Sequence, residues 1–313
     1  MDYVIKKIIS SVVTLLFVIL LIFIAFRIIP GNPAHIILGV EATPSQIAAL
    51  EQKLGLDKTL TEQFFDFLKG IVLFDFGESL RFSQPVLSLI GERIGVTFSL
   101  AVISILITII VSIPLGILAA SYKGKLPDII ISISSQIGLA VPSFWMGIIL
   151  IMIFGLFLKI ISVGGYVEWS ENPFLAFKSL FFPALAIAIP QIAIIIRYLR
   201  TTIIEQLSLD YVRTATSKGL KGYQILFHHV LRNALIPVIT IAGLNFGEIL
   251  AGSLVIEQVF ALPGFGRMLI TAIGDRDFPL VQGMVFFIAI IAILVNLLVD
   301  LSYRVLDPKI RLK

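Results

Sequence analysis

The chain has 313 residues, of which 58% are apolar and 14% are charged, whereas soluble domains average about 45–50% apolar and about 25% charged residues. So few charges cannot cover a water-exposed surface, which excludes a soluble enzyme, a disordered chain, collagen and a coiled coil. The net charge is +4, cysteine is absent and histidine occurs three times, so disulfide scaffolds are excluded and no metal site is predicted. The fold class predicted is an all-α polytopic membrane protein.

Six apolar segments are long enough, or nearly so, to cross a bilayer as helices, because a hydrocarbon core about 30 Å thick requires roughly 20 residues. They are 8–29, 97–120, 129–158, 180–196, 234–256 and 279–299. The first follows Lys6 and Lys7 and could be a signal peptide, but its apolar core exceeds the usual length of about 7–15 residues. We therefore expect an uncleaved helix. Pro142 should break the third segment.

Lysine and arginine counts indicate the orientation of these helices, because basic loops remain in the cytoplasm. If the N-terminus is cytoplasmic, the inner segments hold 14 basic residues and the outer segments hold nine. These inner segments are 1–7, 121–128, 197–233 and 300–313. We therefore expect both termini on the cytoplasmic side.

The stretch 30–96 is long for a connection and is expected to fold as a small helical subdomain on the outer side. One helical pattern ends at Gly55, and a second pattern covers 61–71. The predicted organisation is an N-terminal helix in 1–29, an extracytoplasmic subdomain in 30–96 and a five-helix transmembrane core in 97–313.

The inner loop 197–233 is too polar to span a membrane and too patterned to be disordered. Asp210 can cap a helix and Gly219 can end it, which predicts a short helix over 211–218. A second amphipathic helix is expected over 223–231. Such a loop suits docking on a soluble partner, and from these residues alone a position flat on anionic lipid is an equally good interpretation.

Residues 210–220 read Asp-Tyr-Val-Arg-Thr-Ala-Thr-Ser-Lys-Gly-Leu and resemble the EAA loop of bacterial ABC importer permeases, in the version of the dipeptide, oligopeptide and nickel permease subunits. The likeness extends in order over nearly the whole chain, through 27–34, 54–57, 75–79, 113–116, 141–145, 229–237, 257–267, 276–283 and 306–311. Arg213 and Thr214 stand at the glutamate position and the position after it, as is common in this subfamily. Ser217 and the Ile-Gly-Val of 94–96 depart from the frequent residues without removing the loop.

The resemblance implies a permease subunit in the inner membrane of a bacterium or archaeon that performs no covalent chemistry. It also implies two ATPase subunits that bind ATP and magnesium, a second homologous permease subunit and an extracytoplasmic substrate-binding protein. No cofactor of this chain and no nucleic acid are expected, and the sequence has no G-x-x-x-x-G-K-[ST] phosphate loop.

In that family the EAA loop forms a coupling helix that sits in a groove of the ATPase and transmits its motion to the permease pair. The residues carried over to this ATPase-coupling role are Asp210, Tyr211, Arg213, Thr214, Ala215, Lys218, Gly219 and Leu220.

Polar residues within the spans supply the candidate translocation pathway. Glu248 lies near the middle of the fifth predicted span, where an ionisable group is costly and usually faces a cavity or a partner. A pathway or permease-interface role is therefore favoured over a buried structural role. The candidate pathway residues are Glu248, Asn245, Ser253 and Pro142.

The substrate expected from the resemblance is a dipeptide or oligopeptide. The same architecture could import nickel or other metal chelates, opines or oligosaccharides, and the pair Gly247-Glu248 resembles the Gly-Glu of some nickel permeases. An ion-coupled secondary transporter should show an inverted repeat and several ionisable groups in its spans, and a membrane enzyme should show convergent catalytic side chains. Neither pattern is found in the sequence.

Overall fold

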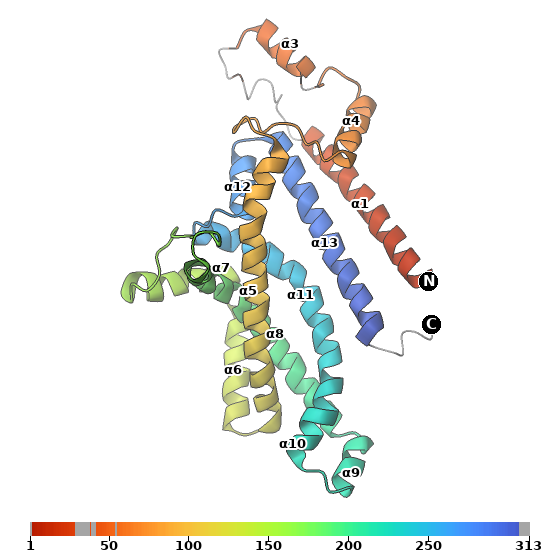
Figure 1. Cartoon of the computed structure of the whole chain (residues 1–313), viewed down its shortest axis with the longest axis vertical. Helices are drawn as coiled ribbons and strands as arrows, with labels where there is room; N and C mark the ends of the chain where they lie inside the picture. Colours follow the sequence, from red (N-terminus) through yellow and green to blue (C-terminus); the bar gives the residue numbers. More distant parts are fainter. Residues whose placement is uncertain (1, 29–37, 39–41, 54, 307–313) are drawn as a thin grey trace. The chain divides into compact units, whose positions relative to one another are not determined.

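The computed structural model describes residues 2–28, 38, 42–53 and 55–306 of the chain. Apart from an isolated antiparallel bridge between Glu78 and Pro85, every regular element in these ranges is a helix (Figure 1). This confirms the predicted all-α class. The predicted motif residues 29–34 and 307–311 lie outside the described residues, as does the predicted end of the first span.

The chain forms two compact units. The first, called the N-terminal unit here, consists of Met1–Gly95 and Gly264–Leu297. The second, called the core unit, consists of Val96–Pro263 and Leu298–Lys313.

Five helices belong wholly or mainly to the N-terminal unit: α1 (Asp2–Ile28), α3 (Pro44–Lys53), α4 (Leu60–Val72), α12 (Phe265–Gly274) and α13 (Phe278–Leu306). Helix α3 is followed by Gly55 at φ +65°, so the predicted stop is confirmed. Helix α4 begins with a capping box, in which the Thr59 amide donates to a Glu62 carboxylate oxygen at 2.9 Å and the Thr59 hydroxyl accepts from the Glu62 amide at 3.4 Å. Hydrogen bonds from the Thr59 side chain and backbone hold the pKa of Glu62 below its usual range.

Two motif segments almost 200 residues apart meet within the N-terminal unit. Asp277 is buried, accepts from the Ser79 hydroxyl and the Arg81 amide, and caps α13 by accepting from the Leu280 amide at 3.3 Å. Arg81 also pairs with Asp275. These contacts satisfy the free amide of a helix start and a buried carboxylate at the same time, so the two motifs have a structural function here.

Gly283 allows a close approach within the same unit. A Cβ atom at this position would lie 2.6 Å from Cγ1 of Val86, and Val86 is fully buried. We predict that Gly283→Ala lowers the stability of the purified protein by about 1–3 kcal/mol, because the overlap forces the helices apart. Gly91→Ala is the matched control, since nothing lies within 4 Å of its Cβ. Equal unfolding midpoints for the two variants would contradict the prediction.

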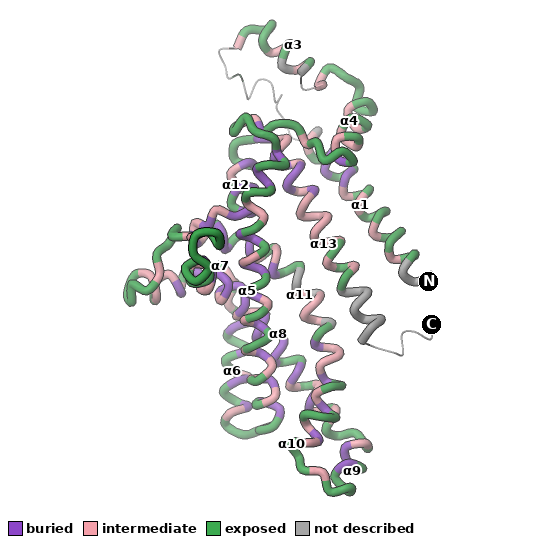
Figure 2. The backbone as a smooth tube through the Cα atoms, in the orientation of Figure 1, coloured by how far each residue is buried: buried purple, intermediate pink, exposed green. Residues whose placement is uncertain are grey.

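The core unit is organised around α8 (Pro173–Leu207), which packs against α6 (Leu126–Ala140), α7 (Ser143–Leu150) and α11 (Leu231–Val259). Its buried residues appear as purple segments in Figure 2. Helix α5 (Val86–Ser121) belongs to this unit from Val96 onward. The remaining elements are η1 (Ile151–Phe157), α9 (Asp210–Ser217), α10 (Gly222–Ile225) and η2 (Leu226–Val230).

Five described helices are long and apolar enough to cross a membrane, or six if the bent pair Leu126–Ala140 and Ser143–Phe157 is one span. The predicted third span is therefore not one continuous helix: α6 and the α7–η1 segment meet at an angle of 103°. The break lies at Pro142, which precedes α7 and has extended backbone angles. Proline has no amide hydrogen to continue the helical hydrogen-bond ladder, so the position of the break was predicted correctly but its size was not.

The ends of several helices differ from the sequence predictions. Helix α5 begins at Val86 rather than at residue 97, and α8 covers 173–207 rather than 180–196. The predicted separate helix over 223–231 is wrong, because α10, η2 and α11 follow one another without a break. Residues 223–231 are thus the first turns of the fifth long helix.

Candidate functional site

Helix α9 is the predicted short helix of the inner loop, and its existence is confirmed. Its start differs from the prediction, because Leu209 is the N-cap residue and makes no side-chain capping bond. Asp210 is instead the first helical residue, where a negative charge favours the positive pole of the helix. Its carboxylate lies 3.5 Å from the Arg213 guanidinium, and both side chains are more than 80% exposed. Such an exposed pair contributes little to stability.

Gly219 ends α9 as the sequence predicted. It adopts φ +80°, its amide donates to the Thr216 carbonyl at 2.9 Å, and the Leu220 amide donates to the Ala215 carbonyl at 3.3 Å. This is the Schellman arrangement, in which a left-handed residue lets the chain reverse and satisfy the last carbonyls of a helix.

One face of α9 is anchored to the longer helices of the core unit. Val212 and Ala215 are buried in a cluster with Leu199 and Ile203 of α8 and Val230 of η2. Further anchors come from Leu220, which packs on the same cluster, and from Tyr211, whose hydroxyl donates to the Gln206 side-chain oxygen at 2.8 Å. Because α9 is held by packing rather than by a flexible tether, a force applied to it reaches α8 and α11.

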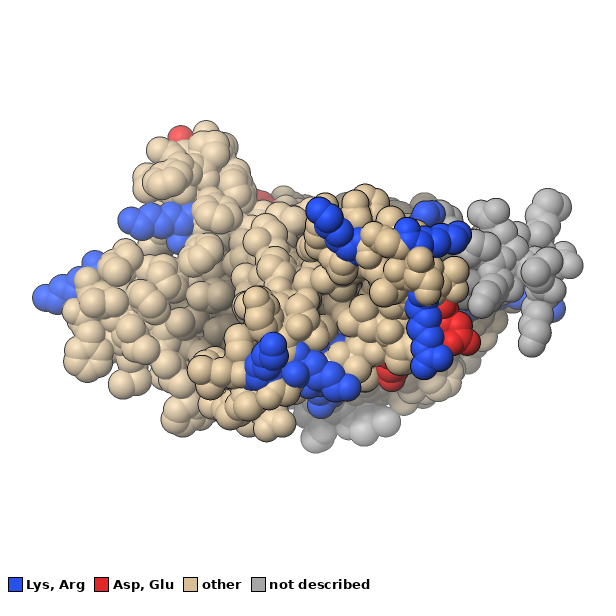
Figure 3. Space-filling view, turned by 90° about the horizontal axis from the view of Figure 1, so that it is seen from below, with Lys and Arg blue, Asp and Glu red and all other residues tan. Residues whose placement is uncertain are grey.

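The other face of α9 is exposed. Its exposed residues include Asp210, Arg213, Thr214, Ser217 and Lys218. Segments 121–128 and 197–233 together contain eight Lys and Arg residues and three Asp and Glu residues. The view onto this end of the core unit shows many blue basic side chains and few red acidic ones (Figure 3). The predicted coupling residues therefore form one helix with an anchored face (Tyr211, Ala215, Leu220) and a free polar face.

An ion pair beside this cluster was missed by the sequence analysis. The Arg200 Nε and Nη2 atoms lie 2.5 and 2.8 Å from the two carboxylate oxygens of Asp128, which also accepts from the Gly124 amide at 2.8 Å. The Asp128 side chain is only 4% exposed. This bidentate pair, called the inner clamp below, joins the first turn of α6 to α8, and the Gly124 hydrogen bond ties the preceding turn to it.

The structure brings two of the four candidate pathway residues together with a third polar residue that the sequence analysis missed. Asn245 and Glu248 are three residues apart on α11 and share a face. The Gln191 side chain of α8 donates to a Glu248 carboxylate oxygen at 3.3 Å. The same seam continues toward the C-terminal end of α11, where a Cβ on Gly252 would lie 3.9 Å from Ile187. We call Gln191, Asn245 and Glu248 the mid-span cluster.

The mid-span cluster is incompletely satisfied within the described part of the chain. The Gln191 Oε1 and Asn245 Nδ2 atoms are buried and have no hydrogen-bond partner there, which is costly for polar atoms away from water. Glu248 itself is exposed.

The other two candidate pathway residues lie apart from this cluster. The Ser253 hydroxyl is fully buried and donates to the Leu250 carbonyl at 2.6 Å. Pro142 is exposed at the bend before α7.

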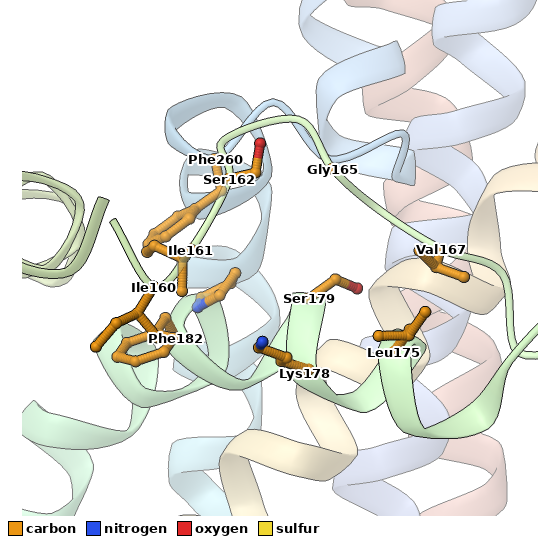
Figure 4. A pocket seen from close by; sticks show the side chains of 11 residues that line it. Ile160, Ile161, Ser162, Gly165, Val167, Leu175, Lys178, Ser179, Phe182 and Phe260 are labelled. Atoms are coloured by element: carbon orange, nitrogen blue, oxygen red, sulfur yellow. The ribbon is translucent and has the colours of Figure 1, made fainter. Parts of the chain in front are cut away.

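A separate cavity of about 200 Å³ opens where residues 160–167 pass over the start of α8 (Figure 4). Its walls include Ile161, Phe182 and Phe260, with Lys178 and Ser179 at one side. No group of three or more His, Asp or Glu side chains in the described residues is arranged to hold a metal ion.

The sequence matches two protein-family descriptions. Residues 112–312 match "Binding-protein-dependent transport system inner membrane component", and residues 1–101 match its N-terminal part.

Named relatives align with nearly the entire chain. A Brucella abortus protein whose name describes a peptide transport system permease is 38% identical over 308 residues, which is 98% of each chain. A Sinorhizobium fredii protein named as a peptide ABC transporter permease is 36% identical over 99% of each chain. The glutathione transport system permease protein GsiC of Pectobacterium atrosepticum is 37% identical over 100% of each chain.

Proposed function

Because the chain belongs to the family of binding-protein-dependent transport system inner membrane components, we propose that it imports peptides as one permease subunit of an ABC transporter. The permease is a transport component and not itself an enzyme. The three relatives named above carry peptide or glutathione transport names, and these names support a peptide over a metal chelate, an opine or an oligosaccharide.

The proposed complex contains a second homologous permease, two ATPase subunits and an extracytoplasmic binding protein. ATP and magnesium bind to the ATPases, and this chain binds no cofactor. We place the multi-pass chain in the inner membrane of a bacterium or archaeon, with both termini and α9 in the cytoplasm. The excess of basic residues around α9 supports this orientation.

The observation that carries the proposal is the two-sided geometry of α9. Its free face offers polar and charged side chains for docking, and its anchored face is buried against α8 and η2. When the ATPases close on ATP, movement of a docked α9 is transmitted through this packed cluster to α8 and α11. A permease that switches between two conformations needs a docking element of this kind. The ATPase can shift the balance between the two conformations only through contacts that differ between them.

Introduced cysteines provide a direct test, because the chain has no native cysteine. Thr214→Cys on the free face of α9 should crosslink to a cysteine in the ATPase surface and should be shielded from labelling on the outer side. Ser170→Cys is the control, since Ser170 is exposed in the segment before α8 and should be labelled only from outside. Outside labelling of Thr214→Cys would refute the orientation.

The substrate is tested separately with the complex in proteoliposomes. ATP inside, the loaded binding protein outside and trialanine as substrate should give uptake that requires both ATPases. Absence of trialanine uptake by the wild-type complex would refute a peptide importer of this class.

A further inference from the structure

Glu248 is an acidic residue without a basic partner in the part of the chain described. Its side chain is exposed, and its carboxylate accepts a hydrogen bond from the Gln191 side chain. The salt bridges among the described residues pair other acids. A charged group at this depth requires a counter-charge or a water-filled cavity, and none of the salt bridges among the described residues supplies that counter-charge.

The space beside Glu248 is open on the same helix. Nothing lies within 4 Å of a Cβ built on Gly247. Across the seam, the amide of Gln191 is 6% exposed and its Oε1 atom lacks a partner. One turn toward the inner side, Asn245 Nδ2 is a buried donor that has no acceptor among the residues the structure describes. The cluster therefore combines an exposed charged acceptor, Glu248, with a neutral acceptor and a donor that are buried in the seam between α8 and α11.

This set matches the amino end of a peptide. An α-ammonium group donates up to three hydrogen bonds and carries one positive charge, and the first peptide carbonyl beside it is an acceptor. We infer that the mid-span cluster binds the free amino end of the transported peptide. Glu248 binds the ammonium group, Gln191 is a positioning residue that orients the Glu248 carboxylate, and Asn245 donates to the first carbonyl once the seam between α8 and α11 opens. This inference rests on the proposed peptide-import function.

The inference explains why the cluster is unsatisfied in the free chain. A cluster that was fully hydrogen-bonded by its own helices would bind a passing substrate only after breaking those bonds. Unfilled donors and acceptors instead make the passing peptide a better partner than the resting state. These groups do not trap the peptide, because its ammonium contact with Glu248 can be released when the packing between α8 and α11 changes.

The test compares trialanine with N-acetyl-trialanine, which lacks the ammonium charge. ATP-driven uptake is measured in proteoliposomes with the wild-type binding protein in excess. Every permease variant receives the same binding protein. Any preference of the binding protein between the two peptides therefore cancels when the uptake by a variant is divided by the uptake by the wild type. Glu248→Gln should lower trialanine uptake roughly tenfold and leave N-acetyl-trialanine uptake unchanged. Glu171→Gln, at an exposed acid outside the spans, should change neither.

Gln191→Met tests the positioning role. This variant keeps the size of the side chain but cannot donate to Glu248, so trialanine uptake should fall and N-acetyl-trialanine uptake should not. If Gln191 acts through Glu248, trialanine uptake by the double variant, Gln191→Met with Glu248→Gln, should be no lower than uptake by Glu248→Gln alone. Additive losses would overturn the positioning role.

Three results would overturn the assignment while leaving peptide import in place. They are an equal loss for both peptides, no loss for either peptide, and failure of Glu248→Gln to copurify with the second permease. The last would identify Glu248 as an interface residue, because removing a charge from a span favours membrane insertion, so the lost copurification could not be attributed to failed insertion. If wild-type complex does not take up trialanine, the proposed function fails first and this assignment fails with it.

Discussion

Replacing Gly219 by valine should reduce ATP-driven uptake about tenfold or more while leaving membrane insertion intact. Gly219 adopts φ +80°, and a non-glycine residue in this region costs roughly 1–2 kcal/mol, more for a β-branched side chain. Nothing lies within 4 Å of its Cβ, so the effect is backbone strain and not a steric clash. A strain of this size corresponds to about a tenfold change in an equilibrium.

The strain would act at the junction that fixes α9. The Leu220 and Gly219 amides close the helix only when residue 219 is left-handed. Relieving the strain breaks these bonds and releases Leu220 from its cluster, so α9 no longer moves together with α8. The expected signature is ATP hydrolysis that continues while uptake falls.

A graded set of substitutions separates strain from other effects. Gly219→Asn should retain most uptake, because asparagine tolerates the left-handed region, and alanine should be intermediate. Gly222→Val is the matched control, three residues away at the start of α10, with no positive φ and nothing within 4 Å of its Cβ. Wild-type uptake in Gly219→Val would refute coupling through α9.

The long helices and α9 could be predicted because their signals are local. An uninterrupted apolar run as long as the membrane is thick predicts a spanning helix. A glycine after an amphipathic stretch predicts the end of a helix. The ends of α8 were missed because apolar length measures only the part within the bilayer. A local signal for its start was present in Asn172-Pro173: the Asn172 side chain accepts from the amides of Phe174 and Leu175, and proline suits the first helical turn.

The features that were not predicted depend on contacts distant in sequence. Pro142 marks a break, but the 103° bend also requires α7 to pack closely against α11. A Cβ on Gly147 would lie 3.1 Å from both Ile256 and Phe260, a tight approach that glycine accommodates without moving either side chain. Gln191 is one polar residue in an apolar run, and its pairing with Glu248, 57 residues later, has no periodic signature. The mid-span cluster therefore became visible only once α8 and α11 were placed side by side.

The inner clamp between Arg200 and Asp128 should contribute strongly to the stability of the folded protein. Arg200→Ala should destabilise the purified complex by about 3 kcal/mol, because it leaves the Asp128 carboxylate buried without its counter-charge. Asp128 would retain the Gly124 amide and the Ser132 hydroxyl, the latter at 3.3 Å. These neutral donors do not replace a bidentate guanidinium. The Arg200 side chain is 29% exposed, so water entering the vacated space limits the loss.

Two companion variants identify the cause of that loss. Arg197→Ala is the matched control one turn earlier on α8, where the guanidinium is exposed and lies 5.6 Å from the ring centre of Tyr198. It should cost less than about 1 kcal/mol. The double variant Asp128→Ala with Arg200→Ala should be more stable than Arg200→Ala alone, because no buried charge remains. Thermal unfolding of the detergent-purified complex measures all three, and equal midpoints for Arg200→Ala and Arg197→Ala would contradict the clamp.

The clamp should also affect transport, because it lies beside the cluster on which α9 is anchored. Ala120, the penultimate residue of α5, belongs to that cluster together with Leu199, Ile203 and Val212. The clamp fixes the start of α6 to α8 through Arg200, which follows Leu199 in the chain, and the Gly124 amide ties the turn after α5 to the same carboxylate. Loosening it should allow the cluster to deform when the ATPases move α9, so less of that motion reaches α11. Uptake per ATP hydrolysed should therefore fall in Arg200→Ala even at temperatures where the complex remains folded, and should recover in part in the double variant.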